Sequence, residues 1–161
     1  MRHGIAIDRG DPGCPIEAKR FLTKEGVSKT REAAEALRAL GVSPNLWFTS
    51  PYTRAVQTAE ITAGVLGHPI SRILPTDTLL PMSEPEKFYD LLSVEKAPSA
   101  ICFGHAPHED ELIAFLLGVE GRVTSLKKSG IACIEVDFSK KSNNVMQWLM
   151  GPRMFRLIKN V

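Results

Sequence analysis

The sequence is poor in cysteine, in long apolar runs and in excess charge. Its three cysteines, Cys14, Cys102 and Cys133, are odd in number and far apart, which fits a reducing compartment better than a disulfide framework. No run of twenty apolar residues occurs, so neither a membrane span nor a signal peptide is predicted. A net charge of +2 is too small to indicate nucleic-acid binding. We therefore expect a cytoplasmic protein without a membrane or nucleic-acid partner.

The 161 residues are expected to form a single domain over 1–161, with an apolar content of 43% that suffices for a core. Apolar periodicity predicts helices over 23–40, 52–67, 87–93 and 108–118, and strands over 45–50, 70–74, 99–104, 130–138 and 144–150. Strands and helices alternate until the last two strands, which follow each other directly. The pattern predicts an α/β fold, a three-layer α/β/α sandwich with a mostly parallel central sheet and an antiparallel element.

Signals at helix starts refine these boundaries. Thr23 is placed to cap the first helix. Ser50, with Pro51 after it, is placed to cap and open the second. Ser83 and Glu86 have the spacing of a capping box at the start of the third helix.

Polar residues cluster at the chain start and at the ends of two of the expected strands. Arg2-His3-Gly4 opens the chain, 49–54 contains Arg54, and 104–107 contains His105. Arginine offers a planar fork of donors that fits phosphate oxygens, and histidine can act as a nucleophile near neutral pH. Because ligands collect at the carboxyl ends of parallel strands, these residues predict a pocket for a transferable phosphoryl group. The four histidines lack carboxylates at ligand spacing, so neither a metal nor another cofactor is predicted.

The ordered motifs resemble a known family over nearly the whole chain. RHG at 2–4, LTKEG at 22–26, SPYTRAVQTA at 50–59 and GH at 104–105 have the order and spacing of the histidine phosphatase (phosphoglycerate mutase-like) superfamily. The short length and LKKSG at 126–130 resemble its SixA-type phosphohistidine phosphatase branch. The resemblance implies the phosphoglycerate mutase-like fold and a metal-independent phosphatase.

The same resemblance implies a role for each matching residue. His3 matches the histidine that becomes phosphorylated, and Arg2 and Arg54 match the arginines that grip the phosphoryl group. His105 matches the second histidine of the pocket, which binds a phosphoryl oxygen. Arg20 matches a frequent basic position and is expected on the pocket rim. The reaction would proceed by transfer to His3 and then by attack of water.

The general acid is the least defined part of the site. Larger members of the family supply a carboxylate from a loop after the third strand, and the nearest carboxylate here is Glu84. Asp8 is a second, weaker candidate. Glu84 also suits the start of a helix, where the helix dipole stabilises a negative charge. A missing acid would favour phosphoramidate substrates over alkyl phosphates.

Three functions are therefore compatible with the sequence. The first is a phosphohistidine phosphatase acting on a histidine-phosphorylated carrier or signalling domain. The second is a broad phosphatase of small phosphate esters, which needs a working acid. The third is a non-catalytic module that binds phosphorylated proteins through Arg2, Arg54 and His105.

The start of the chain raises a separate expectation. Family members usually carry about four to six apolar residues before the RHG triplet, whereas only Met1 precedes Arg2 here. Either the chain begins late relative to the native protein, or the first strand is truncated. A truncated strand would leave the backbone groups of its neighbours without partners.

Overall fold

The structure is a computed structural model that describes residues 1–158. Its helices are α1 (Lys24–Ala39), α2 (Thr53–Leu66), α3 (Pro85–Glu95), α4 (His108–Leu117) and α5 (Pro152–Ile158), and its strands are β1 (Leu46–Thr49), β2 (Ile73–Pro75), β3 (Ala100–Phe103), β4 (Ile131–Glu135) and β5 (Val145–Met150). Four single 3₁₀ turns complete the described elements, of which Glu17–Lys19 matters for the site.

The strands form two sheets. The first is parallel with the order β2-β1-β3, in which Trp47 lies opposite both Ile73 and Ile101. The second is the antiparallel pair β4-β5, with an irregular register between Cys133 and Ile134. The predicted α/β fold with a parallel sheet and an antiparallel element is thus confirmed.

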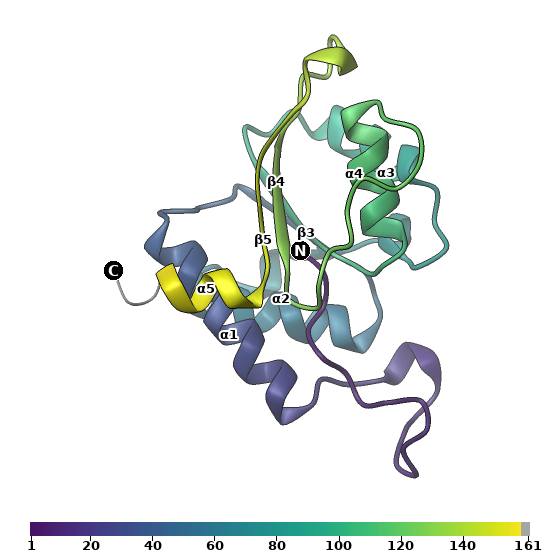
Figure 1. Ribbon diagram of the computed structural model, residues 1–161, viewed down its shortest axis with the longest axis vertical. Coiled ribbons are helices and arrows are strands. Elements are labelled where there is room, and N and C mark those ends of the chain that lie inside the picture. Colours follow the sequence, from purple (N-terminus) through teal and green to yellow (C-terminus); the bar gives the residue numbers. More distant parts are fainter. Residues whose placement is uncertain (159–161) are drawn as a thin grey trace.

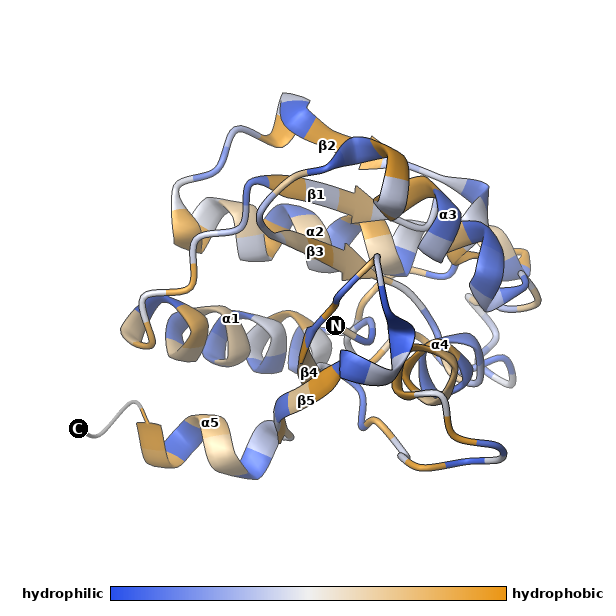
Figure 2. Cartoon of the chain, turned by 90° about the horizontal axis from the view of Figure 1, so that it is seen from above, coloured by the Kyte–Doolittle hydropathy of each residue, from blue (hydrophilic) through white to orange (hydrophobic). Residues whose placement is uncertain are grey.

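Helices cover both faces of the parallel sheet (Figure 1). On one face, Trp47 and Phe103 pack against alanines of α1 and α2 and against Phe155 of α5. On the other face, Phe48 packs against α3 and α4. Since side chains alternate across a strand, neighbouring residues such as Trp47 and Phe48 serve opposite cores. Figure 2 shows β1 and β3 as apolar ribbons between helices of mixed hydropathy, as a sheet covered on both faces requires.

Several boundaries differ from the predictions. The side chain of Thr23 does cap α1, accepting a hydrogen bond from the Gly26 N–H. The capping box is wrong, because α3 begins after Glu84 with no side-chain cap. Pro51 is not the first helical residue, because α2 begins after Tyr52. Helix α5 was not predicted at all.

Residues 1–3 are held like a strand, although only one bridge is formed. Arg2 makes an isolated parallel bridge with Gly104, whose N–H donates to the Met1 carbonyl at 3.2 Å. The Met1 ammonium donates to the Cys102 carbonyl at 2.7 Å. On the opposite side, the Arg2 N–H donates to the Gly130 carbonyl at 3.0 Å. The chain start therefore lies between β3 and β4 and forms this isolated bridge in place of a strand.

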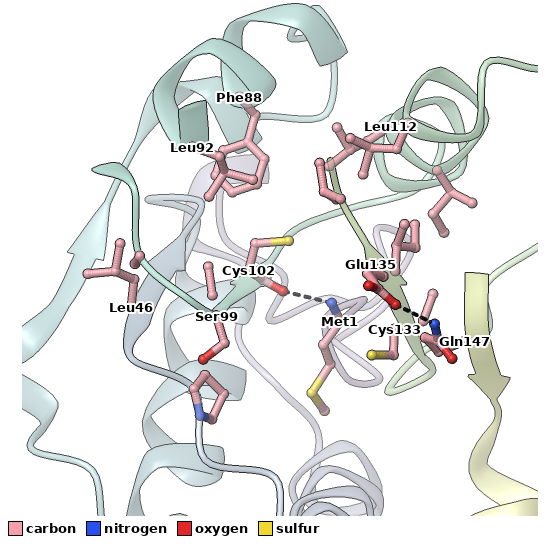
Figure 3. Close-up of a pocket in the computed structure, with 18 of the residues that line it drawn as sticks. Met1, Leu46, Phe88, Leu92, Ser99, Cys102, Leu112, Cys133, Glu135 and Gln147 are labelled. Atoms are coloured by element: carbon pink, nitrogen blue, oxygen red, sulfur yellow. Dashed lines mark hydrogen bonds between the residues drawn. The ribbon is translucent and has the colours of Figure 1, made fainter. Parts of the chain in front are cut away.

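An apolar groove of about 480 Å³ continues from Met1 between β3 and β4 (Figure 3). Its lining comes from β3, β4, α3 and α4 and includes Phe88, Leu92, Cys102, Leu112, Cys133 and Ile134. Within residues 1–158, β3 pairs only with β1, and β4 pairs only with β5. The groove is thus flanked by two strand edges that have no strand partner.

Close packing of Gly26 against residue 5 fixes the segment that follows His3. A Cβ added at Gly26 would overlap the backbone oxygen of Ile5. We expect Gly26→Ala to lower the free energy of unfolding by about 1–3 kcal/mol, because backbone atoms must move to admit the methyl group. Gly64→Ala is the matched control: it faces open space on α2 and should stabilise the protein by up to about 1 kcal/mol. Urea unfolding of both variants measures the difference, and equal effects would contradict the prediction.

Candidate active site

The segment 126–130 holds Arg2 and His3 in place through hydrogen bonds. The Ser129 N–H donates to the carbonyls of Arg2 and His3, both at 3.1 Å. The Arg2 guanidinium donates through Nη1 to the Leu126 carbonyl at 2.7 Å. The LKKSG motif therefore holds the first motif in place, although residues 5–125 separate the two in the sequence.

The hydrogen bonds of His3 define its tautomer. Nδ1 lies 2.7 Å from the Gly4 carbonyl oxygen, which can only accept, so Nδ1 carries the proton. Nε2 accepts from Nε–H of Arg54 at 3.3 Å. The imidazole thus presents an unprotonated Nε2, which is the form a nucleophilic histidine needs.

Arg54 and His105 come from the two neighbouring strand ends. Arg54 lies in the first turn of α2 and is only 3% exposed. His105 follows β3, is 1% exposed, and its ring centroid lies 5.1 Å from that of His3. Nε2 of His105 lies 2.8 Å from the Ser50 hydroxyl. The structure therefore brings Arg2, His3, Arg54 and His105 together, as the strand-end argument predicted.

Ser50 and Tyr52 join the site without having been predicted there. Ser50 was expected to open the second helix, but it instead pairs with His105 through its hydroxyl. The Tyr52 ring packs edge-on to His105 at 5.3 Å and lies under the Arg54 guanidinium at 5.0 Å. Ser50 and Tyr52 thus help to fix the orientation of the His105 ring, and Tyr52 also contacts Arg54.

Burial and neighbouring cations keep both site histidines neutral. Desolvation, and then the charges of Arg54, Arg2 and Lys128, lower the pKa of His3 from 6.5 to about 3. Desolvation is also the main reason that the pKa of His105 is lowered to about 2. At neutral pH the positive charge around the pocket therefore comes from Arg54, Arg2 and Lys128 and not from the histidines, which suits a ligand with a dianionic phosphoryl group.

Two buried polar atoms of the site lack a partner within the described part of the chain. They are Nδ1 of His105 and Nε of Arg2. An unpartnered buried donor is costly unless a ligand satisfies it. When the Ser50 hydroxyl donates to Nε2 of His105, Nδ1 carries the proton, and phosphoryl oxygens are acceptors of the kind that both atoms then need.

Glu17 is the carboxylate that contacts the site, and sequence reasoning missed it. Its Oε1 lies 2.9 Å from Nη2 of Arg54, and its backbone carbonyl accepts from Nη1 at 2.9 Å. Arg20 pairs with the same carboxylate at 3.3 Å and donates to the Ile7 carbonyl, and its place on the rim stays a prediction. A hydrogen bond from Arg9, with the charges of Arg54 and Arg20, lowers the pKa of Glu17 to about 2.

The candidate acids have other partners. Glu84 is 70% exposed and pairs with Lys87 at 3.0 Å. It directly precedes Pro85 and Glu86, which line a cavity of about 740 Å³ that also reaches Arg2. Asp8 is exposed in the loop that follows His3, and its backbone N–H donates to the Asp11 carboxylate. The role of an acid therefore stays a prediction for Glu84 and for Asp8.

The described residues contain neither a cluster of metal-binding side chains nor a membrane-spanning helix. Among residues 1–158, no group of three or more histidine, cysteine or acidic side chains is arranged to hold a metal ion. No helix in the same range is long and apolar enough to cross a membrane.

The neutral histidines make stability depend on pH. Below pH 6.5 these histidines become protonated in the unfolded chain but stay neutral in the folded protein. The free energy of unfolding should therefore fall as the pH drops from 7 to 5. Each such ring contributes up to about 1.4 kcal/mol per pH unit. His105→Gln should show a shallower fall in urea unfolding at pH 7, 6 and 5. An identical slope in the variant would show that His105 is not the source.

The chain matches known proteins across its length. Residues 1–74 match the sequence model of the histidine phosphatase superfamily (branch 1). An uncharacterized protein of Picosynechococcus sp. is 37% identical over 135 residues, covering 81% of this chain and 79% of the relative. The structure of the protein histidine phosphatase SixA with tungstate superposes with a TM-score of 0.82 at 27% identity, over 96% of each chain.

A more distant structure extends the fold comparison. The alpha-ribazole phosphatase from Shigella flexneri has a TM-score of 0.73 at 17% identity, over 94% of this chain and 95% of that chain. This likeness concerns the fold alone.

These matches and the site agree on the class of protein. The architecture is that of phosphoglycerate mutase-like phosphatases, with the histidine and arginine motifs at the carboxyl edge of the sheet. The chain belongs to the histidine phosphatase superfamily, branch 1, and is a phosphatase with a SixA-like structure.

Proposed function

We propose that this phosphatase removes the phosphoryl group from a phosphohistidine in a protein. The reaction proceeds through a covalent intermediate in which His3 carries the phosphoryl group. The observation that carries the proposal is the unprotonated Nε2 of His3 beside the Arg54 guanidinium, with the proton fixed on Nδ1. The similarity to SixA, a protein histidine phosphatase, favours the same substrate class.

The first half-reaction forms a P–N bond at Nε2 of His3 and breaks the P–N bond of the substrate. Arg2 and Arg54 would neutralise the phosphoryl oxygens, and His105 would donate to one of them through its free Nδ1. A phosphohistidine ring protonated on its other nitrogen leaves as neutral imidazole, so no donor is needed at the bond that breaks. Water then attacks the phosphorus of phospho-His3, which releases orthophosphate and restores the neutral His3.

The state of the carboxylates favours this substrate over an alkyl phosphate. Departure of an alkoxide needs a proton donor, and a general acid works best when its pKa lies near the operating pH. Glu17 contacts Arg54 but is kept ionised by three arginines, with its pKa at about 2. Hydrolysis of small phosphate esters therefore requires Glu84, or another acid, to approach the pocket.

The test is a comparison of kcat/KM on a phosphohistidine-bearing carrier protein, a sugar phosphate and an aryl phosphate. The proposal expects the phosphohistidine protein to be preferred by at least about a hundredfold over the sugar phosphate, because only the imidazole leaves without acid help. Glu84→Gln should leave the phosphohistidine rate unchanged. A preference for the sugar phosphate that Glu84→Gln removes would establish the ester phosphatase instead.

A further inference from the structure

The contacts of Glu17 suggest a second role for the loop that precedes α1. All three guanidinium nitrogens of Arg54 are engaged: Nε with His3, Nη1 with the Glu17 carbonyl and Nη2 with the Glu17 carboxylate. A phosphoryl group on Nε2 of His3 would lie beside the same guanidinium. Carboxylate and phosphoryl oxygens use the same donor fork of arginine, so they compete for it.

The two partners of this ion pair differ in freedom. The Arg54 side chain is 4% exposed, and its Nη1 stays anchored to the Glu17 backbone even without the carboxylate. The Glu17 side chain is 37% exposed, and of its two other partners Arg9 is 74% exposed and Arg20 is 14% exposed. The carboxylate is thus the part that can move away, and its backbone carbonyl is sufficient to keep Arg54 in position.

We propose that the Glu17 carboxylate is an internal competitor that occupies the phosphoryl-oxygen position of Arg54 in the empty site and thereby sets the affinity for phosphate groups. The inference rests on the proposed function in that Arg54 grips the phosphoryl group. Binding must displace Oε1 from Nη2 of Arg54, and the departing carboxylate keeps its contacts with Arg9 and Arg20. The displacement weakens the retention of orthophosphate, the product, and disfavours ligands that offer only a phosphate.

This role determines which substrates are selected. A small phosphate monoester brings little binding energy besides its phosphoryl group, so it bears the full cost of displacing Glu17. A phosphorylated protein contacts the surrounding surface as well, and that additional contact offsets the cost. Glu17 would therefore be a specificity-determining residue that raises KM for small esters more than for protein substrates.

The test measures the dissociation constant of inorganic phosphate by isothermal titration calorimetry, which needs no turnover. Glu17→Gln and Glu17→Ala should each bind phosphate about tenfold more tightly, because a charge-assisted contact no longer opposes it. Glu17→Asp keeps the charge but shortens the reach to Arg54, and it should also bind more tightly. Glu25→Gln is the control for net charge, since Glu25 pairs with Lys29 on α1, and it should change the constant by less than about twofold.

The outcomes separate this inference from the proposed function. Tighter phosphate binding in the three Glu17 variants, with a lower KM for an aryl phosphate, supports the competitor. Unchanged or weaker phosphate binding in folded Glu17→Gln and Glu17→Ala overturns it, because the carboxylate would then support Arg54. Absence of phosphate binding in the wild type and in every variant would overturn the proposed function itself.

Discussion

Replacing His3 with alanine is expected to abolish turnover of a phosphohistidine protein, with a loss of roughly 10³-fold or more in kcat. The variant removes Nε2 of His3, the atom that forms the phosphoryl–enzyme bond in the proposed reaction. The arginines and His105 remain, so phosphate should still bind. The effect belongs to kcat because the nucleophile acts in the chemical step.

The covalent intermediate gives this prediction a direct readout. Wild-type protein quenched during turnover should carry acid-labile, alkali-stable phosphate on His3, and His3→Ala should carry none. Arg54→Lys serves as a second variant: it keeps the positive charge but loses the fork that contacts His3 and Glu17, so it should retain the label at a reduced rate. Full activity of a folded His3→Ala protein would refute catalysis through His3.

The central pocket was within reach of sequence reasoning for a geometric reason. Arg54 and His105 each follow a short apolar run, and parallel strands place their carboxyl ends at one edge of the sheet. Arg2 and His3 were harder to place, because a single residue precedes them and no apolar run signals a strand. Their position depends on the bridge to Gly104 and on the hydrogen bonds from Ser129, which connect residues over a hundred positions apart.

The features that were missed have weak local signals. Glu17 lies in a 3₁₀ turn of three residues, and its contact with Arg54 arises from the path of the loop between Gly4 and Phe21, which has no periodic pattern. Helix α5 has only seven residues, although Pro152 after Gly151 could have marked its start. Ser50 was assigned to a helix cap, while tertiary contact with His105 decides its position. In each case long-range packing prevails over local preference.

Joining an apolar segment of about four residues to Met1 is expected to stabilise the protein and to raise its activity. The groove beyond Met1 is apolar, and the edges of β3 and β4 on either side of it carry backbone groups without a strand partner (Figure 3). At about 3.3 Å per residue, four residues would extend along the whole of β3, which runs from Ala100 to Phe103. The register is already set, because Arg2 lies opposite Gly104.

The expected gain is the balance of burial and ordering. Each apolar side chain placed in the groove contributes about 1.5–3 kcal/mol, while each ordered residue costs about 1–2 kcal/mol of conformational entropy. Hydrogen bonds to both strand edges add about 1 kcal/mol each. We expect a net gain of about 2–3 kcal/mol and a rise in Tm of about 5–10 °C. A firmer hold on Arg2 and His3 should raise kcat as well.

Glu109 determines how the extension has to be tested. Its buried carboxylate lies 3.4 Å from the Met1 ammonium and accepts from the Gly104 N–H at 3.1 Å. An added residue converts that ammonium into a neutral amide, and burial already raises the pKa of Glu109, so the carboxyl should then become protonated.

An extension of Gly and Ser with the same length is the matched control. This control loses the ion pair between the Met1 ammonium and Glu109 and places no apolar side chains in the groove, so it should lower the Tm. Glu109→Gln should offset that loss in both extended proteins, since its amide oxygen can still accept from Gly104. If the apolar and the Gly/Ser extensions melt at the same temperature, the groove does not accept a strand.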